Sequence, residues 1–314
     1  MATAANLAFI ILGLLLLFAG AESLVRGSTS LALRAGLSPL LAGLTIVAFG
    51  TSAPELVVSV EAALSGRGDL SVGNVVGSNS FNIAVILGIV ALVCPIPVAG
   101  QIIRSDAPIA LGAALLLPLL LLDQMVGRGE GLLLAVGLLV YVSMNVLTAR
   151  RQAAADAGAD AVPGISRHWG LDLGFVALGL GVLILGSHLL VDNAVALAEA
   201  LGVSEAVIGL TIIAAGTSTP ELATSLVAAL RSQPDVAIGN VIGSNIFNLL
   251  GILGVASLVA PLQAPGISLL DVGAMIAFSA LLILFLYTGR LLQRTEGAVL
   301  LTLYGIYLFF LWPA

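Results

Sequence analysis

Charged residues are scarce in this chain. Only 9% of its 314 residues are Asp, Glu, Lys or Arg, whereas soluble domains carry about 25%. The mean hydropathy is +1.17, and several apolar runs reach the ~20 residues with which a helix spans a bilayer. We therefore predict an all-α polytopic membrane protein, multi-pass in the cell (inner or plasma) membrane.

Lysine is absent, and cysteine occurs once, as Cys94, which excludes an internal disulfide. All eleven basic residues are arginines, and none precedes the first apolar run. Because a signal peptide begins with a basic segment, we expect 7–25 to be a retained first helix.

Apolar length and Gly/Pro punctuation divide the chain into ten predicted transmembrane helices. They lie near 5–31, 38–64, 71–93, 105–122, 128–149, 171–198, 204–230, 236–259, 267–287 and 296–312. The polar, Ala/Asp/Gly-rich connection at 149–168 is interpreted as a flexible linker. The expected organisation is a first five-helix repeat at 1–149, a cytoplasmic linker at 150–167 and a second, inverted five-helix repeat at 168–314.

Arginines are unevenly distributed among the connections between these helices. Only Arg67 and Arg128 fall at even-numbered connections. The other nine fall at odd-numbered ones: Arg26, Arg34, Arg104, Arg150, Arg151, Arg167, Arg231, Arg290 and Arg294. Because basic residues accumulate in cytoplasmic loops, the odd connections are predicted to be cytoplasmic, which places both termini outside (N-out/C-out).

The two halves repeat one another in sequence. A gap-free alignment that places Thr45 on Thr211 matches TIVAFGTSAPEL with TIIAAGTSTPEL, and VGNVVGSNSFN with IGNVIGSNIFN. Roughly 27 of the 46 positions in 43–88 are identical to their partners in 209–254. Five helices per half is an odd number, so the second half must enter the membrane from the opposite side. Two inverted five-helix repeats are typical of secondary transporters, whose sites lie near the midplane.

The stretch GTSAPE, residues 50–55, places a proline and a glutamate inside the second predicted helix. Pro54 lacks an N–H, so the carbonyl of Gly50 loses its helical partner and the helix is expected to kink or break. A membrane tolerates such a break only where it faces protein, water or an ion. Thr51 and Ser52 lie four and three residues before Glu55, on its helical face. Such hard oxygen ligands suit sodium or calcium better than zinc or copper.

A second motif, GSNSFN at 77–82, supplies Ser78 and Asn82, four residues apart on one helical face. The second half repeats both motifs and supplies Thr217, Ser218, Glu221, Ser244 and Asn248. A carboxylate at mid-span costs ~2.5–3.5 kcal/mol and marks function by default. Glu55 and Glu221 together carry two negative charges, which one divalent cation neutralises.

Other polar residues receive no role in this site. Asp69 and Asp235 precede helices and are interpreted as N-caps. Ser59 and Ser225 are interpreted as packing residues. Glu22 lies within the first predicted helix, but its repeat partner is His188, so symmetry gives it no place in the site.

At these motifs the sequence resembles the cation/calcium antiporter superfamily, and within it the sodium/calcium exchangers of prokaryotic type. GTSAPE…GNVVGSNSFN and GTSTPE…GNVIGSNIFN resemble that family's two α-repeats, and the resemblance covers essentially the whole chain. It implies four cation sites at the membrane centre and a sliding gating pair formed by the first and sixth helices, here 5–31 and 171–198.

Carried over by motif position, the resemblance implies that Glu55 and Glu221 are shared ligands for calcium and sodium. The implied remaining ligands are the carbonyls of Thr51 and Thr217, the hydroxyls of Ser52, Ser218, Ser78 and Ser244, the amides of Asn82 and Asn248, and the flanking sodium-site carbonyls of Ala48 and Ala214. Many relatives have Asp at one of the two Asn positions. Asn at both weakens the case for potassium-assisted sodium/calcium exchange.

The function expected is therefore secondary antiport of Na⁺ against Ca²⁺ by alternating access, with electrogenic Ca²⁺ extrusion. A proton/calcium exchanger is the nearest alternative, and an intramembrane acid-pair enzyme or a channel are others. No nucleophile–histidine constellation is present, so we expect no enzyme activity. The expected partners are Na⁺, Ca²⁺ and the lipid bilayer, with no cofactor and no nucleic acid. The sequence specifies no oligomeric state and is compatible with a monomer.

Overall fold

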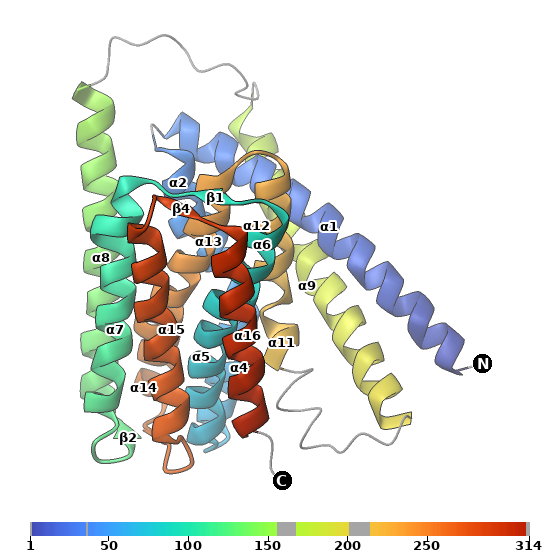
Figure 1. Ribbon diagram of the computed structural model, residues 1–314, viewed down its shortest axis with the longest axis vertical. Coiled ribbons are helices and arrows are strands. Elements are labelled where there is room, and N and C mark those ends of the chain that lie inside the picture. The colour runs from blue at the N-terminus through green and yellow to red at the C-terminus, as the bar shows by residue number, and fades with distance from the viewer. Residues whose placement is uncertain (1, 36, 156–167, 201–213, 312–314) are drawn as a thin grey trace.

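The computed structural model describes residues 2–35, 37–155, 168–200 and 214–311, and it is predominantly helical (Figure 1). The first half contains α1 (Ala2–Arg34), α2 (Pro39–Ala42), η1 (Gly43–Val47), α3 (Ala48–Thr51), α4 (Ala53–Leu64), α5 (Gly68–Phe81), η2 (Asn82–Ile86), α6 (Leu87–Val93), β1 (Ile96–Pro97), η3 (Ile102–Asp106), α7 (Ala107–Leu120), β2 (Met125–Val126) and α8 (Arg128–Ala155). The second contains α9 (Trp169–Ala200), α11 (Ala214–Thr217), α12 (Thr219–Leu230), α13 (Pro234–Ile246), η5 (Phe247–Ile252), α14 (Leu253–Val259), β3 (Leu262–Gln263), α15 (Leu269–Tyr287), β4 (Leu291–Leu292) and α16 (Arg294–Leu311).

The helices confirm a protein that crosses the membrane many times. Seven of the described helices are long and apolar enough to span a bilayer, and the bent pair Pro39–Thr51 and Ala53–Leu64 makes an eighth candidate. Of the predicted helix 204–230, only the part from Ala214 lies within the described residues. The last predicted helix is present as α16. The exact number of ten crossings stays a prediction.

The predicted linker begins later than expected. Helix α8 continues without interruption through Ala155, because the Ala-rich stretch after residue 149 favours helix. Residues 156–167, the remainder of the predicted linker, lie outside the described residues.

Of the four described π-helical turns (η), three lie next to the two repeated motifs, and η3 begins the candidate span Ile102–Leu120. Turn η1 precedes GTSAPE, while η2 and η5 begin at the end of GSNSFN and GSNIFN. A π turn inserts one residue into the helix and is frequent at functional sites. The residue inserted by such a turn changes which side chains share a helical face on its two sides.

Two short strand pairs lie at opposite ends of the helical bundle (Figure 1). Ile96 pairs with Leu292 at one end, and Val126 pairs with Leu262 at the other. The alignment of the two halves places Ile96 on Leu262 and Val126 on Leu292, so one pair maps onto the other. Repeat-equivalent contacts at opposite ends are the arrangement that an inverted repeat requires.

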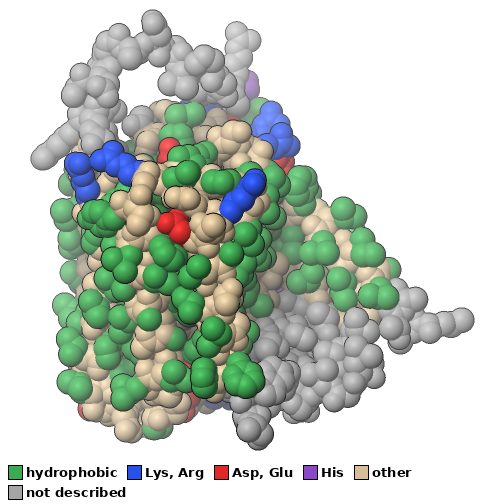
Figure 2. All heavy atoms as spheres, in the orientation of Figure 1, with side chains coloured by type: hydrophobic (Ala, Val, Ile, Leu, Met, Phe, Trp, Pro, Cys, Tyr) green, Lys and Arg blue, Asp and Glu red, His purple; other side chains and the backbone are tan. Residues whose placement is uncertain are grey.

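The exterior is apolar, as a lipid-facing protein requires. On the face shown in Figure 2, hydrophobic side chains cover the length of the bundle, and the basic side chains lie toward the end that carries β1 and β4. Helices α1 and α9 pack side by side along one flank (Figure 1).

The N-cap predictions for Asp69 and Asp235 are wrong. The N-caps of α5 and α13 are Arg67 and Gln233, and both aspartates lie inside the first helical turn. Asp69 instead accepts a hydrogen bond from the backbone N–H of Gly266 at 2.7 Å. A carboxylate in the first turn still interacts favourably with the helix dipole. An aspartate near the start of a helix therefore suits the first turn as well as the N-cap.

Candidate cation-binding site

Both GTS-x-PE motifs interrupt a helix at the serine, as the sequence predicts. Ser52 has φ −81° and ψ 7°, and Ser218 has φ −88° and ψ 8°, so each separates two helices. Pro54 and Pro220 follow in the first turn of the next helix, where a missing N–H is tolerated. In the first half the two helices meet at an angle of 45°.

The two halves exchange hydrogen bonds at this break. The hydroxyl of Ser52 donates to Oε1 of Glu221 at 2.9 Å, and the hydroxyl of Ser218 donates to Oε1 of Glu55 at 3.0 Å. All four side chains are at most 1% exposed. Through these crossed hydrogen bonds the structure brings the two predicted acids together in one buried cluster.

This arrangement corrects one sequence-based expectation. Helical spacing places Ser52 on the face of its own Glu55, but the serine contacts Glu221 of the other half instead. The i, i+3 rule requires a continuous helix, and the helix is interrupted at Ser52 itself. The break therefore redirects the hydroxyl across the boundary between the halves.

Several buried polar atoms in the cluster have no hydrogen-bond partner among the described residues. Both glutamates leave Oε2 unpartnered. The other such atoms in these motifs are Oδ1 of Asn79, Oδ1 of Asn82, Oγ of Ser244, and Oδ1 and Nδ2 of Asn248. A buried polar atom without a partner is costly, and oxygen atoms of this kind are the ligands that sodium and calcium accept.

The remaining predicted ligands lie in the same repeated motifs or directly before them. Ser78 is buried on α5, and the Asn82 amide donates to Oδ1 of Asn245 at 3.0 Å. The carbonyl of Ala48 accepts the N–H of Ser52 at 3.0 Å. Thr217 ends α11, and Ala214 begins it, directly after the undescribed segment 201–213. Their carbonyls stay predictions as ligands.

Two asparagines that were not predicted hold the glutamate helices in place. The amide of Asn74 donates to the backbone carbonyl of Glu55 at 3.2 Å and to the hydroxyl of Ser59 at 2.9 Å. Asn240 makes the equivalent contacts with Glu221 at 3.3 Å and Ser225 at 2.9 Å. Both asparagines belong to the sequence GNV that the two halves share. This repetition is the one feature of the sequence that could have predicted a role for them.

Thr51 links the halves through one of these asparagines. Its hydroxyl lies 3.1 Å from Oδ1 of Asn240 and 3.1 Å from the carbonyl of Val47. A hydroxyl has one proton to donate, and both of these partners are acceptors. The threonine hydroxyl therefore lies where the two halves meet, near the Glu221 carboxylate as well, and its backbone carbonyl stays a prediction as a ligand.

Glu22 and His188 lie outside the cluster, in agreement with the symmetry argument. Glu22 forms an ion pair with Arg231 at 2.8 Å, with a third of its side chain exposed, and His188 is exposed on α9. Among the described residues, no group of three or more His, Cys, Asp or Glu side chains could hold a metal ion. The cluster therefore offers two carboxylates supplemented by hydroxyl and amide oxygens.

A multi-pass helical protein with a buried oxygen cluster shared between repeated halves belongs to the class of ion transporters rather than enzymes. A family model described as "Sodium/calcium exchanger protein" matches residues 5–147 and 171–312. The chain belongs to the sodium/calcium exchanger family of cation/calcium antiporters, of the prokaryotic type.

Individual relatives support the same assignment. The sodium/calcium exchanger MaX1 of Methanosarcina acetivorans is 30% identical in an alignment that covers 96% of this chain and 97% of that protein. The inner membrane protein YrbG of Escherichia coli is 38% identical over 259 residues, which cover 81% and 80%. A structure of the sodium-calcium exchanger NCX_Mj in zero Na⁺ and Ca²⁺ has a TM-score of 0.83 at 32% identity, covering 98% of this chain and 99% of that one.

Proposed function

We propose that the protein exchanges Na⁺ for Ca²⁺ by alternating access at a single midplane site built on Glu55 and Glu221. The observation that carries this proposal is the crossed pair of serine–glutamate hydrogen bonds, which leaves one free oxygen on each carboxylate. Two carboxylates suffice to neutralise one Ca²⁺, and the surrounding hydroxyl and amide oxygens complete its preferred shell of six to eight ligands.

Charge neutralisation couples the two fluxes. A cluster with two uncompensated negative charges is costly to enclose in a low-dielectric environment, so the empty site resists reorientation. Either Ca²⁺ or several Na⁺ ions remove that cost, which gives exchange rather than leak. With the family's three Na⁺ per Ca²⁺, each cycle moves one net charge, worth ~2.3 kcal/mol per 100 mV. Inward sodium then drives calcium out, and no cofactor is needed.

Sodium coupling is tested against its nearest alternative in proteoliposomes. We expect ⁴⁵Ca²⁺ uptake into sodium-loaded vesicles to be driven by the outward sodium gradient. An inside-positive membrane potential should accelerate this uptake, because each cycle carries net positive charge outward. Proton coupling would appear instead as uptake that follows a pH gradient and is indifferent to sodium. Hydroxyl and amide oxygens beyond two carboxylates are superfluous for protons, which is why we favour sodium.

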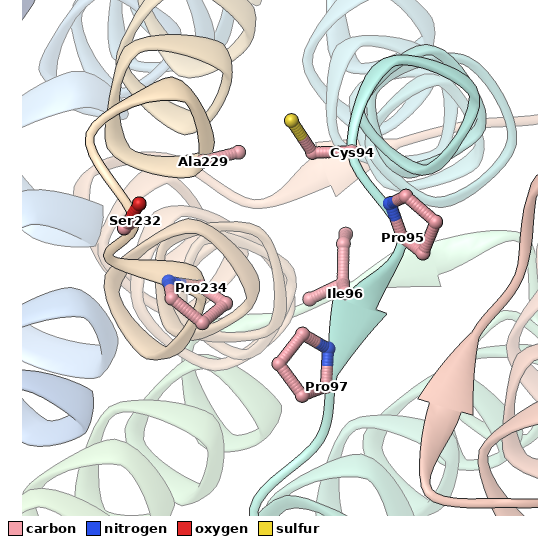
Figure 3. A pocket seen from close by; sticks show the side chains of 7 residues that line it. All are labelled: Cys94, Pro95, Ile96, Pro97, Ala229, Ser232 and Pro234. Carbon is pink, nitrogen blue, oxygen red and sulfur yellow. The ribbon is translucent and has the colours of Figure 1, made fainter.

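The N-out/C-out orientation is proposed from the arginine distribution and has a direct test in the unmodified chain. Cys94 follows α6 directly and lies beside a cavity of about 340 Å³ between β1 and the α12–α13 turn (Figure 3). This end of the bundle is cytoplasmic in the proposed orientation. Because Cys94 is the only cysteine, one thiol reports on one side of the membrane.

We therefore expect a membrane-impermeant maleimide to label inside-out vesicles and to leave intact cells unlabelled. The Cys94→Ser variant supplies the background, and detergent-solubilised protein supplies full labelling. Labelling of intact cells to the same extent as the detergent-solubilised protein would show that the orientation is opposite to the one proposed.

A further inference from the structure

A second cavity lies at the β1–β4 end of the bundle, on a different set of helices. Its volume is about 270 Å³, and its lining residues are Gly100, Ile103, Arg104, Leu286, Tyr287 and Arg290. They come from η3 and the residue Gly100 shortly before it, and from the end of α15 and the turn that follows it. Helices α7 and α15 pack against one another (Figure 1).

Two arginine side chains at this cavity have no partner among the described residues. Arg104 and Arg290 are exposed, and neither side chain makes a hydrogen bond or ion pair within that part of the chain. Arg34 and Arg231, in contrast, are bound by Asp172 and Glu22. The cavity therefore presents two guanidinium groups that no described residue binds. Such groups recognise a phosphate or carboxylate through two parallel hydrogen bonds.

The nearest carboxylate along the chain does not neutralise them. Asp106 follows Arg104 by two residues, but it is fully buried and accepts the phenol of Tyr141 at 3.0 Å. Its other oxygen has no hydrogen-bond partner, from Arg104 or from any other described group. The carboxylate nearest to Arg290 along the chain, Glu296, accepts the hydroxyl of Thr288 at 2.8 Å and the N–H of Gln293 at 2.7 Å. Neither Asp106 nor Glu296 forms an ion pair with the two arginines in the described part of the chain.

The internal repeat shows that the fold itself does not require these arginines. The alignment of the two halves places Arg104 on Leu270 and Gln124 on Arg290. Gln124 and Arg290 share the same left-handed backbone, with φ of 58° and 54°. The equivalent positions at the opposite end of the bundle thus have the same turn but no charge, so the charge belongs to one side alone.

The surroundings of the cavity are those of a membrane interface. Tyr287 and Leu284 on α15 are 65% and 63% exposed, at the end of a segment long and apolar enough to span the bilayer. Tyrosine is enriched at the level of lipid headgroups. A ligand at the arginines would therefore have its polar part at the headgroup level and apolar protein surface below it.

We propose that this cavity binds the phosphate headgroup of an anionic phospholipid, with Arg104 and Arg290 holding the phosphate and the acyl chains lying along α15. Basic pockets between transmembrane helices on the cytoplasmic side recognise such headgroups. The proposed orientation determines only that this leaflet is the cytoplasmic one. The lipid contact itself does not depend on the transport reaction.

Native mass spectrometry of the delipidated full chain tests this site with phosphatidylglycerol and phosphatidylcholine. We expect phosphatidylglycerol to be retained preferentially, and Arg104→Gln and Arg290→Gln each to weaken its binding about fivefold, with about thirtyfold for the double variant. Arg290→Lys retains part of the preference. Arg294→Gln is the matched control, since it removes the same charge from the same end, four residues further along the chain.

Equal binding of the two lipids, or equal losses in Arg290→Gln and Arg294→Gln, would overturn the proposal and leave the arginines as determinants of topology. Displacement of the lipid by excess inorganic phosphate would assign the cavity to a soluble anion instead. Thermal unfolding of each variant confirms that the compared proteins are folded.

Discussion

Glu55→Gln is expected to abolish calcium exchange, and Glu221→Gln is expected to do the same. Each change removes one of the two charges that neutralise Ca²⁺ while keeping the size of the side chain. Losing one member of a buried charge pair costs about 3 kcal/mol, which corresponds to a loss of more than ~100-fold in calcium affinity. Sodium-driven ⁴⁵Ca²⁺ flux in proteoliposomes measures the effect.

The two glutamine variants are expected to lose calcium exchange to the same extent. Each glutamate accepts one serine hydroxyl from the opposite half and leaves its other oxygen without a partner among the described residues. Glu61→Gln is the matched control, since Glu61 is exposed on the same helix α4, and its flux should match the unmodified protein. Sodium-driven flux that persists in one glutamine variant would remove that glutamate from the site.

The second large effect is expected at the packed pair α1 and α9. A side chain added at Gly179 would place its Cβ 2.6 Å from the backbone nitrogen of Leu24 and 2.8 Å from the carbonyl oxygen of Gly20. Both contacts are with backbone, which cannot rotate away. Gly179→Val is therefore expected to destabilise the protein by about 1–3 kcal/mol, measured as a lower unfolding temperature in detergent.

The same helix provides the control for this substitution. A Cβ added at Gly181 meets nothing among the described residues within 4 Å, so Gly181→Val should lower the unfolding temperature far less than Gly179→Val. Similar destabilisation in both variants would mean that valine weakens α9 generally and that the close approach to α1 is unimportant.

Loss of flux in Gly179→Val would bear on the proposed gating pair. Within the pair, Arg34 binds Asp172 at 2.7 Å and the Ser23 hydroxyl donates to the carbonyl of Phe175 at 2.8 Å. These contacts bind α1 to α9, and the glycines let the two backbones touch. If the helices slide as one body, as the resemblance implies, then separating them should slow transport. This loss of flux should be seen at temperatures where the Gly179→Val protein is still folded.

Much of the site could be predicted from the sequence because the repeat shows each feature twice. A glutamate directly after a proline within an apolar helix is unusual even as a single occurrence. Because a second one lies at the aligned position of the other half, the sequence alone predicts that the two glutamates act as a pair. The proline position likewise predicts the helix break that the structure has at Ser52 and Ser218.

The partners of individual side chains could not be predicted in the same way. Ser52 contacts Glu221 because the helix break changes the direction of its side chain, and a helical spacing rule cannot represent that change. The π turns have no residue type of their own, so they were missed. Asn74 and Asn240 occupy ordinary helical positions in the sequence, and only the three-dimensional packing brings their amides to the carbonyls of the two glutamates.

The central claim is that one divalent cation binds between carboxylates from both halves. Anomalous diffraction from crystals soaked in Sr²⁺, an electron-rich substitute for Ca²⁺, tests it directly. The account predicts one dominant peak within coordination distance of both Glu55 and Glu221, about 2.3–2.6 Å for calcium and slightly longer for strontium. A dominant peak that contacts only one of the glutamates, or lies elsewhere in the bundle, would contradict it.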